Sequence, residues 1–529
     1  MTYDAIVIGG GVNGLVAASY LAKGGKRVVV CERRESLGGV SVTEEFHPGF
    51  RANTAVDDAG WVPERVMRDL ALARHGYTPA FAASGLTFPV DDGTAVSLPA
   101  NVGEAASILH RLSPADAARW PAFCAMVERL SGFLAVLYEA PAPDVHARSM
   151  SDILTMMSLG RRVRGLGKRG MIDLLRTIPM PVSDLLDEWF EHPGLKAALS
   201  LLGVLNVQHG PYSGGTSLVF LHRHVGLPEG HIGGRRMTPG GVGRLPLALA
   251  AAARAAGVDV LTRSEVAEIV VERDRVAGVR LSRGDVLSAA TIVSSADPRR
   301  TFGTMIDPGW FDPGMLNAID NIRMRGPATR LHLALSELPA FSSGGSQWPV
   351  EALRGWIALP RSVEEVERAY DAAKHGGIAA QPAILATIPT LDDPSLAPTG
   401  AHVLSVQSQY TAYAPDGGWT EAVRAAMSNA VLDGLTRVAP RIRDIVQHVQ
   451  VLAPPDLEAR FGVTEGSVLH GELALDQYLF MRPIPECARH ATPLEGLWLC
   501  GSGTHPGAGT AGASGVLAAR AILSNRRNA

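Results

Sequence analysis

The chain begins with a short apolar run that leads directly into a glycine-rich turn. Residues 5–8 are A-I-V-I, and the six residues that follow, G-G-G-V-N-G, place Gly9, Gly11 and Gly14 in the pattern G-x-G-x-x-G. A helix rich in small residues is predicted over 15–22 and a second apolar strand over 27–31. Strand, turn, helix and strand in this order form a βαβ unit. The sequence therefore predicts an α/β fold built on a parallel sheet.

The same turn predicts a site for nucleotide phosphates. The first glycine permits the tight turn, the second lets the backbone approach a pyrophosphate, and the third lets the helix pack closely on the strand. Free N–H groups at the helix N-terminus attract an anion. Glu32 ends the second strand, where its carboxylate can accept hydrogen bonds from a ribose. A purely structural turn can carry the same glycines, but this context favours a dinucleotide.

Glycine-rich segments elsewhere in the chain indicate FAD rather than NAD. Gly38 and Gly39 follow Glu32 and can bring further backbone amides to the phosphates. Residues 498–519 predict another strand, glycine-rich loop and helix. One contiguous stretch of chain forms a nicotinamide-binding domain. A longer ligand with a ribityl chain and a ring system needs contacts from a second segment far along the sequence.

The 529 residues exceed what one compact core accommodates. We predict that an FAD-binding domain is assembled from residues 1–75, 232–310 and 490–529. The rest is expected to form a substrate domain, with a largely helical part over 76–231 and a strand-and-helix part over 311–489.

Composition excludes several other classes. A net charge of -3 gives no general attraction to nucleic acid. The four cysteines lie far apart, so neither a zinc site, a redox dithiol nor a disulfide framework is expected, and no metal is predicted. No basic, apolar leader precedes the first strand, and no apolar run reaches the roughly 18–20 residues of a membrane-spanning helix. We expect a cytoplasmic protein.

The set G-G-G-x-x-G … E-x-x-x-x-x-G-G … G-x-G-T-H-P-G-A-G resembles the phytoene desaturase and carotenoid isomerase group of flavoproteins. Segments 38–50 and 470–483 are most similar to a branch named after a pyridine nucleotide-disulfide oxidoreductase domain but built like the desaturases. The similarity runs nearly end to end. It implies a glutathione-reductase-type FAD-binding Rossmann domain, made from discontinuous segments, with an inserted mixed sheet-and-helix substrate domain.

The resemblance also implies which residues hold the cofactor. The glycines of the first turn, Glu32 and the Gly38-Gly39 pair match the contacts of the family with AMP and pyrophosphate, and the backbone of Val266 matches the position beside the adenine. Ser502 stands where many relatives carry an acidic residue on the ribityl hydroxyls, so the resemblance leaves that contact open. The expected cofactor-binding residues are Gly9, Gly11, Val12, Asn13, Gly14, Glu32, Arg33, Gly38, Gly39, Val266, Gly501, Ser502, Gly503, Gly512 and Ala513.

The name of the branch points to NAD(P)H and a dithiol, and this sequence supports neither. It has no second G-x-G-x-x-G after a strand and no cysteine pair that could relay electrons. We therefore expect O2, a quinone or another redox carrier to accept the electrons.

Two residues are candidates for catalysis. His505 lies in the loop that the family places against the flavin ring, and a histidine that only shapes this turn is the alternative. Tyr410 ends a predicted strand, and a core or interface tyrosine is the simpler interpretation.

Other polar residues can be explained without a functional role. His209, His222 and His224 are expected to be surface or helix-capping histidines. Asp57 and Asp58 follow a segment that the family places near the ring, although adjacent aspartates also suit a solvated turn.

A basic stretch interrupts the helical part of the chain. Arg161, Arg162, Arg164, Lys168 and Arg169 lie between apolar segments. Peripheral membrane contact through residues 158–176 is one hypothesis, because a lipophilic substrate could enter there. An exposed, solvated loop is the other.

Three functions are compatible with these features. The first is desaturation of a hydrophobic, isoprenoid-like, cyclic or carbonyl-bearing small molecule by hydride transfer to flavin N5. The second is oxidation of an amine to an imine, for which many related oxidases use a lysine near the flavin. This chain has no lysine between residues 197 and 373 or after 374. The third is a flavin-dependent isomerase or a non-catalytic FAD-binding protein at a membrane.

Overall fold

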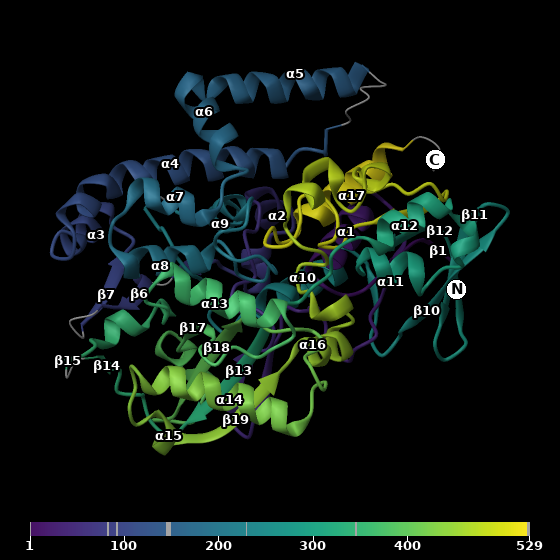
Figure 1. Ribbon diagram of the computed structural model, residues 1–529. Helices are drawn as coiled ribbons and strands as arrows, with labels where there is room; N and C mark the ends of the chain where they lie inside the picture. The colour runs from purple at the N-terminus through teal and green to yellow at the C-terminus, as the bar shows by residue number, and fades with distance from the viewer. Residues whose placement is uncertain are drawn as a thin grey trace.

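The computed structural model describes residues 2–81, 84–90, 94–143, 150–228, 230–343 and 346–525. Two large sheets lie at opposite sides of the molecule, and helices cover both of them (Figure 1). The N-terminus and the C-terminal helix lie beside the first sheet. The chain leaves this sheet and returns to it, so segments far apart in sequence meet there.

The first sheet has seven strands from three separated stretches of the chain. Their order is β10-β11-β12-β1-β2-β9, and β20 pairs with β12. The strands β12, β1, β2 and β9 run parallel, whereas β10, β11 and β12 form an antiparallel meander. The strands are β1 Thr2–Ile8, β2 Val28–Cys31, β9 Asp259–Leu261, β10 Val266–Glu272, β11 Arg275–Leu281, β12 Val286–Ser294 and β20 Leu497–Leu499.

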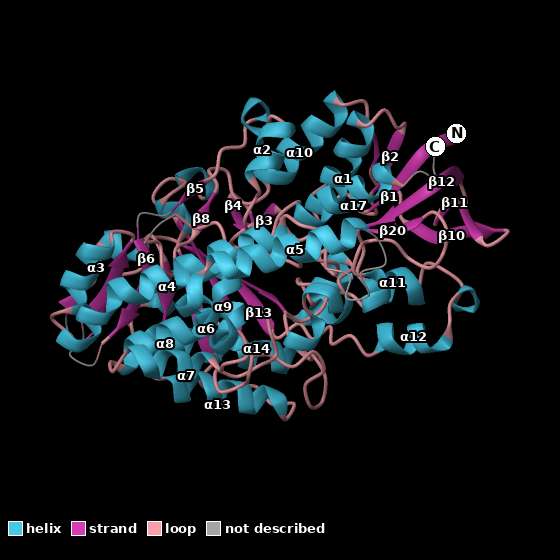
Figure 2. Cartoon of the chain, turned by 90° about the horizontal axis from the view of Figure 1, so that it is seen from above, coloured by secondary structure: helices cyan, strands magenta, loops and turns pink. Residues whose placement is uncertain are grey.

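Helices on the first sheet bring the two ends of the chain together. Ile6 and Val7 of β1 are fully buried, as is typical of a central parallel strand. Figure 2 shows α1 (Val12–Lys23) beside α17 (Ala513–Ser524). Close packing requires glycine at Gly515, because a Cβ there would lie 2.3 Å from the carbonyl oxygen of Asn13. The predicted α/β fold with a discontinuous Rossmann domain is confirmed.

The second sheet belongs to the inserted region, and its order is β19-β13-β18-β17-β16-β6-β7. Its strands are β6 Ser84–Pro89, β7 Ala95–Pro99, β13 Ala328–Leu335, β16 Trp356–Ala358, β17 Ala383–Thr387, β18 His402–Gln409 and β19 Val446–Leu452. β6 pairs in parallel with β16, although the two are more than 250 residues apart. The stretches 76–231 and 311–489 therefore share one sheet. The sequence does not predict this pairing, because a short strand contains no pattern that identifies its partner strand.

A layer of helices covers one end of the second sheet. Within it, α4 is the one described helix that is long and apolar enough to cross a membrane, but half of its apolar stretch is buried in the protein. Its Trp120, Phe123 and Leu130 belong to the hydrophobic core, as expected for a core helix. The helices of this layer are α3 Val102–Leu109, α4 Pro114–Tyr138, α7 Val182–Trp189, α8 Pro193–Leu202 and α9 Thr216–His224, and α5 Met150–Gly165 and α6 Gly167–Thr177 lie beyond α4.

The basic stretch is helical rather than a loop. It runs through the end of α5 and the start of α6, and α5 lies outside the main body of the molecule (Figure 1). The main helices and strands that remain are β3 Thr43–His47, β4 Phe50–Asn53, α2 Glu64–Asp69, β5 Ala80–Phe81, β8 Arg236–Met237, α10 Arg244–Ala255, α11 Pro298–Gly303, α12 Pro313–Asp320, α13 Val363–Lys374, α14 Glu421–Thr436, α15 Ile442–Ile445 and α16 Pro454–Phe461.

Candidate functional site

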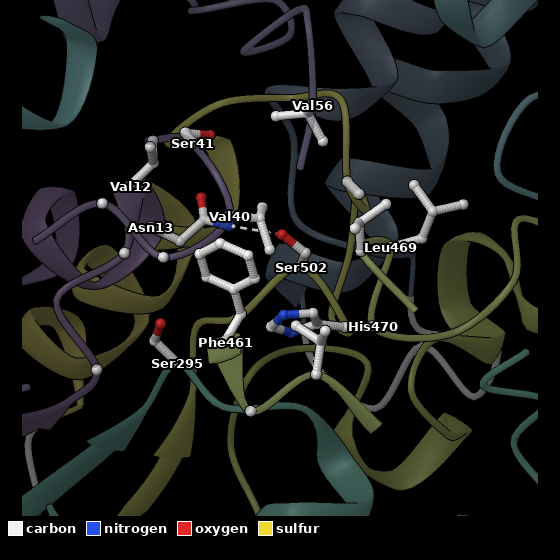
Figure 3. A pocket seen from close by; sticks show the side chains of 18 of the residues that line it. Val12, Asn13, Val40, Ser41, Val56, Ser295, Phe461, Leu469, His470 and Ser502 are labelled. Atoms are coloured by element: carbon white, nitrogen blue, oxygen red, sulfur yellow. Dashed lines mark hydrogen bonds between the residues drawn. The ribbon is translucent and has the colours of Figure 1, made fainter. Parts of the chain in front are cut away.

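A deep cavity, called the cofactor cavity below, lies between the first sheet and the inserted region. All three stretches that build the first sheet contribute to its wall, and so do loops of the inserted region (Figure 3). In Figure 3 Asn13, Ser41, Ser295 and Ser502 surround it, with Phe461 and His470 reaching in from the inserted region. Among the predicted cofactor-binding residues, those lining it are Gly9, Gly11, Val12, Asn13, Glu32, Arg33, Gly38, Gly39, Val266 and Ser502.

The N-terminus of α1 forms one wall of the cofactor cavity. Its N-cap is Gly11, which supplies no side-chain cap, and no acidic residue lies in the first turn. The first N–H groups of the helix thus remain available to an anionic ligand. Gly9 has φ +93°, which an L side chain rarely adopts. A Cβ on Gly14 would lie 2.1 Å from the Gly9 carbonyl oxygen, so Gly14 supports the turn without lining the cavity.

Glu32 is held rigidly at the end of β2. Its Oε2 accepts a hydrogen bond from Gly10 N at 2.7 Å, and its Oε1 accepts one from Arg34 N at 2.9 Å. The carboxylate is buried yet lines the cofactor cavity together with Val266. Each carboxylate oxygen has a further lone pair, so Glu32 can still accept a bond from a ligand hydroxyl.

The C-terminal glycine loop is fixed to α1 by one side chain. Asn13 Oδ1 accepts a hydrogen bond from Gly512 N at 3.0 Å, and Asn13 Nδ2 donates one to Ser502 Oγ at 3.3 Å. Gly501 and Gly503 do not line the cavity, since added Cβ atoms there would lie 2.6 Å from Ser295 O and 2.5 Å from Pro298 Cδ. Gly512 and Ala513 also lie behind the wall, so these four glycine-loop residues support the site by packing.

The residues of the cofactor cavity fit FAD. The uncapped helix turn suits a pyrophosphate, and Glu32 suits a ribose hydroxyl. Asp57 Oδ1 and His470 Nδ1 are buried without a hydrogen-bond partner among the described residues, and both residues line the cavity. Buried polar atoms of this kind normally have partners, which the hydroxyl, carbonyl and N–H groups of a flavin can supply.

His505 does not face the cofactor cavity. The structure buries it almost completely, and its Nε2 donates a hydrogen bond to Ala140 O at 3.0 Å. Ser514 Oγ donates to its carbonyl oxygen at 2.7 Å. Burial lowers the pKa of His505 to about 4. The catalytic expectation for His505 is replaced by a structural role, in which a neutral histidine fixes the glycine loop to the end of α4.

Tyr410 is also outside the cavity. Its side chain is fully buried, its hydroxyl donates a hydrogen bond to His209 O at 2.8 Å, and its ring contacts Tyr370 edge-on. Burial raises the pKa of Tyr410 well above its usual range. The hydroxyl is committed to the backbone, so the structure supports the core interpretation and not the catalytic one.

The three histidines of the helical part lie in different environments. His209 is partly exposed and approaches the Glu472 carboxylate. His222 is buried, with Nε2 donating to Ala508 O at 2.7 Å and Nδ1 accepting from the Tyr138 hydroxyl at 2.7 Å. His224 is buried too and bonds to Phe220 O at 2.7 Å. The expectation of surface histidines is wrong for His222 and His224, because α9 runs through the core.

Several residues of the cavity wall escaped prediction. Ser295 and Ala296 follow β12, and their place could have been inferred because the carboxyl ends of parallel strands meet at one edge. Arg223 of α9, Trp356 of β16 and Phe461 of α16 also line the cavity. They come from the inserted region, where no sequence motif indicates which side chains turn toward the cofactor.

The cysteines offer no redox dithiol. All four are free and buried. Burial raises the pKa of Cys31, Cys124 and Cys487 to about 12 in each case, and it raises that of Cys500 further. Each therefore remains a protonated thiol at neutral pH.

Comparison with known proteins identifies the family. Residues 13–523 match the family model of flavin containing amine oxidoreductases. The chain is 32% identical to pyridine nucleotide-disulfide oxidoreductase domain-containing protein 2 of Rattus norvegicus, over 99% of this chain and 94% of that protein. It is 28% identical to one of the subunits of limonene dehydrogenase from Castellaniella defragrans, over 98% and 94%, and 26% identical to a neurosporene-forming phytoene desaturase of Cereibacter sphaeroides, over 97% and 92%.

A solved structure shows the same fold. Cyclohexylamine oxidase from Brevibacterium oxydans superimposes with a TM-score of 0.56 and 14% identity, over 100% of both chains. The predicted resemblance to desaturase-like flavoproteins and the predicted FAD cofactor are confirmed. The chain belongs to the family of flavin containing amine oxidoreductases and is an FAD-dependent oxidoreductase.

Proposed function

We propose that this protein desaturates a hydrophobic small molecule by removing two hydrogens from adjacent carbons. The observation that carries the proposal is a second cavity, called the side chamber below, which shares part of its wall with the cofactor cavity. Leu202, Leu205, Val219, Leu227 and Leu473 line it. These apolar side chains favour the hydrocarbon part of a substrate, whereas polar residues such as Asn206 and Arg223 line the side that faces the cofactor cavity.

The protein and its cofactor have separate roles in the proposed reaction. One hydrogen would leave the substrate with both electrons of its C–H bond, the neighbouring hydrogen would leave as a proton that passes to solvent water, and a C=C bond would form. FAD, when bound, supplies the acceptor for the hydride. The chain itself positions the substrate, and its leucine and valine side chains exclude water from the chamber. The names of two relatives, a limonene dehydrogenase and a phytoene desaturase, support a hydrocarbon substrate.

Amine oxidation is the second candidate, and the wall of the cavities disfavours it. None of the five lysines lines either cavity. Arg223 and Arg236 line the side chamber instead. Asp58, which also lines the chamber, pairs with Arg236, so the charge that would repel a protonated amine is mainly that of Arg223.

Anaerobic reduction of the bound flavin tests the proposal. Cyclic monoterpenes, polyenes and cyclic ketones are mixed in turn with the oxidised holoprotein, and a substrate is expected to bleach the flavin and to yield a product 2 mass units lighter. Val219→Phe, which fills the side chamber, should lower kcat/KM at least tenfold with the flavin spectrum unchanged. Val286→Phe, at an exposed position of β12, is the matched control. Bleaching by amines with release of ammonia would refute desaturation, and no bleaching by any compound would favour an isomerase or a non-catalytic protein.

For reoxidation we infer O2, a quinone or another redox carrier, and not a nicotinamide. The buried, protonated cysteines support this inference, because they cannot relay electrons as a dithiol. Photoreduced protein should be reoxidised faster by at least one of O2, a soluble quinone or ferricyanide than by NAD+ or NADP+. Faster reoxidation by a nicotinamide would contradict it.

We further propose that α5 and α6 bind an anionic lipid surface. Large apolar side chains are unusually exposed there, with Met150 71%, Leu154 59%, Met157 60% and Leu175 74% accessible. The basic residues Arg161, Arg162, Arg164, Lys168 and Arg169 are exposed beside them. Apolar and basic groups together on a helix outside the main body favour a membrane surface over a solvated face.

Vesicle flotation tests this contact. The holoprotein should float with vesicles containing phosphatidylglycerol and much less with pure phosphatidylcholine, because the basic residues attract anionic headgroups. The double variant Leu154→Ser and Met157→Ser should lose flotation. Leu247→Ser, an exposed leucine of α10, is the matched control. Equal flotation of the variant and the wild type would refute the contact.

A further inference from the structure

Arg223 occupies the junction between the two cavities. It lies in the last turn of α9, and its side chain lines both the cofactor cavity and the side chamber. Asp58, Asn206, Trp356 and Leu469 also line both cavities. A ligand group at the junction would therefore contact Arg223 while the rest of the ligand reaches the apolar chamber.

The Asp58 and Asp57 carboxylates attract the guanidinium of Arg223, but it forms no hydrogen bond or close ion pair with the described part of the chain. Among the described residues, none forms a hydrogen bond with it or places a carboxylate within 4.0 Å of it. Its neighbours are already paired. Arg330 Nη2 binds Asp57 Oδ2 at 2.6 Å, and Arg236 Nη1 binds Asp58 Oδ2 at 3.2 Å. Asp58 Oδ1 also accepts a hydrogen bond from Gly60 N at 2.7 Å, so both oxygens of this carboxylate already have a partner.

The charges around the junction leave an excess cation. Three guanidinium groups, those of Arg223, Arg236 and Arg330, face two carboxylates, those of Asp57 and Asp58. The adjacent histidines do not change this balance, because burial lowers the pKa of His222 and of His224 to about 4 and both are neutral at pH 7. The two carboxylates are shared among three guanidinium groups, which leaves a net positive charge in a partly buried site, and such an excess is costly.

A second donor lies beside it. Asn206 Oδ1 accepts a hydrogen bond from Gln407 Nε2 at 3.1 Å, which fixes the orientation of the Asn206 amide. Its Nδ2 donors then have no bond within the described part of the chain, and Asn206 lines both cavities. A guanidinium and an amide N–H together form the donor set that a carboxylate requires.

We propose that Arg223, supported by Asn206, binds a carboxylate of the substrate at the junction, so that the substrate is an amphiphilic acid with its hydrocarbon part in the side chamber. This inference rests on the proposed function, since it names the substrate class of the same site. The paired carboxylate would supply the missing counter-ion. It would also fix which carbons of the hydrocarbon lie next to the cofactor.

Equilibrium binding to the oxidised holoprotein tests the proposal without turnover. The probes are cyclohexanecarboxylate and its neutral isostere cyclohexanecarboxamide, each titrated against the flavin absorbance. Wild type should bind the carboxylate more tightly than the amide. Arg223→Gln should raise the Kd of the carboxylate about ten- to a hundredfold and that of the amide less than threefold. Arg223→Lys should restore part of the difference, and Asn206→Leu should weaken carboxylate binding several-fold.

Controls separate this site from the cofactor and from the fold. Arg254→Gln, at an exposed position of α10, should leave both Kd values unchanged. The FAD content and visible spectrum of Arg223→Gln should equal those of the wild type. Equal binding of the two probes by wild type, or an equal loss of both in Arg223→Gln, would overturn the proposal, as would lowered FAD affinity without a change in probe selectivity. Since no bond is oxidised in these titrations, they remain decisive even if the reaction is not a desaturation.

Discussion

Asp57 and Arg330 form a buried ion pair between the FAD-binding region and the inserted sheet. Oδ2 of Asp57 lies 2.6 Å from Nη2 of Arg330, and each side chain is 2% exposed. Asp57 follows β4, whereas Arg330 belongs to β13. Because Asp57 also lines the cofactor cavity, the pair connects the stability of the interface to the wall of the cofactor site.

Breaking this ion pair should lower the free energy of unfolding. Arg330→Met leaves the Asp57 carboxylate buried without its cation, and the free energy of unfolding should fall by about 3–5 kcal/mol. Urea denaturation followed by intrinsic fluorescence measures the change. The control is Arg280→Met, which removes an exposed pair with Glu268 and should cost less than about 1 kcal/mol. If both variants lost the same free energy of unfolding, the buried pair would contribute no more to stability than the exposed one.

Gly14 should tolerate no side chain. In Gly14→Ala the new Cβ would meet the Gly9 carbonyl oxygen at 2.1 Å, so the turn must shift and FAD should be lost on purification. The FAD-to-protein absorbance ratio measures this. Gly132→Ala lies inside α4 with nothing within 4 Å of the new Cβ, and alanine there should raise stability by up to about 1 kcal/mol while FAD is retained. Full FAD content in Gly14→Ala would refute the packing argument.

Acid should weaken the fold through buried histidines. His505 has a pKa of about 4 in the folded protein and an ordinary value of 6.5, so between these pH values the unfolded chain binds more protons than the folded one. The free energy of unfolding therefore falls as the pH drops through this window. His505→Gln retains an N–H donor for Ala140 and does not titrate. Between pH 7 and pH 5 its free energy of unfolding should therefore fall by roughly 1.5–2 kcal/mol less than that of the wild type.

Urea midpoints at the two pH values give this difference. His110→Gln replaces an exposed histidine and serves as the matched control. A loss on acidification that is the same for His505→Gln and wild type would mean that His505 is not held neutral by the fold.

Tyr410 should matter to stability and not to chemistry. Tyr410→Phe removes the bond to His209 O and leaves a buried acceptor, which should cost about 1–2 kcal/mol in thermal or urea unfolding. The rate of flavin reduction by a substrate should remain within twofold of wild type at a temperature where both are folded. A tenfold slower reduction with normal FAD content would restore the catalytic interpretation of this residue.

The fold was largely predictable because its strongest signals are local. The turn at Gly9, the carboxylate of Glu32 and the loop after Gly501 each carry a pattern whose physical purpose is known, and the first sheet follows from them. The pairing of β6 with β16 had no such signal. Strand partners that are hundreds of residues apart are selected by burial of side chains such as Leu86 and Phe88, which only the assembled core determines.

Only the nucleotide-binding part of the site could be predicted from the sequence. A phosphate cradle is made by backbone, so glycines reveal it, whereas the substrate side is made by single side chains from unrelated elements. Arg223 is one of three basic residues at the end of α9, and no local pattern distinguishes it from His222 or His224. His505 shows the same limit, since a loop near a cofactor can turn a side chain either toward the ligand or into the protein, and the structure buries this one against Ala140.

The bonds from Asn13 to Gly512 and Ser502 have a consequence for biosynthesis. The helix α1 obtains its partner only when the segment around residues 497–524 has emerged from the ribosome. A nascent chain cannot capture its flavin as it is translated, because one wall of the binding site does not yet exist. We therefore expect FAD to bind only after residues 497–524 have been made and have folded against α1.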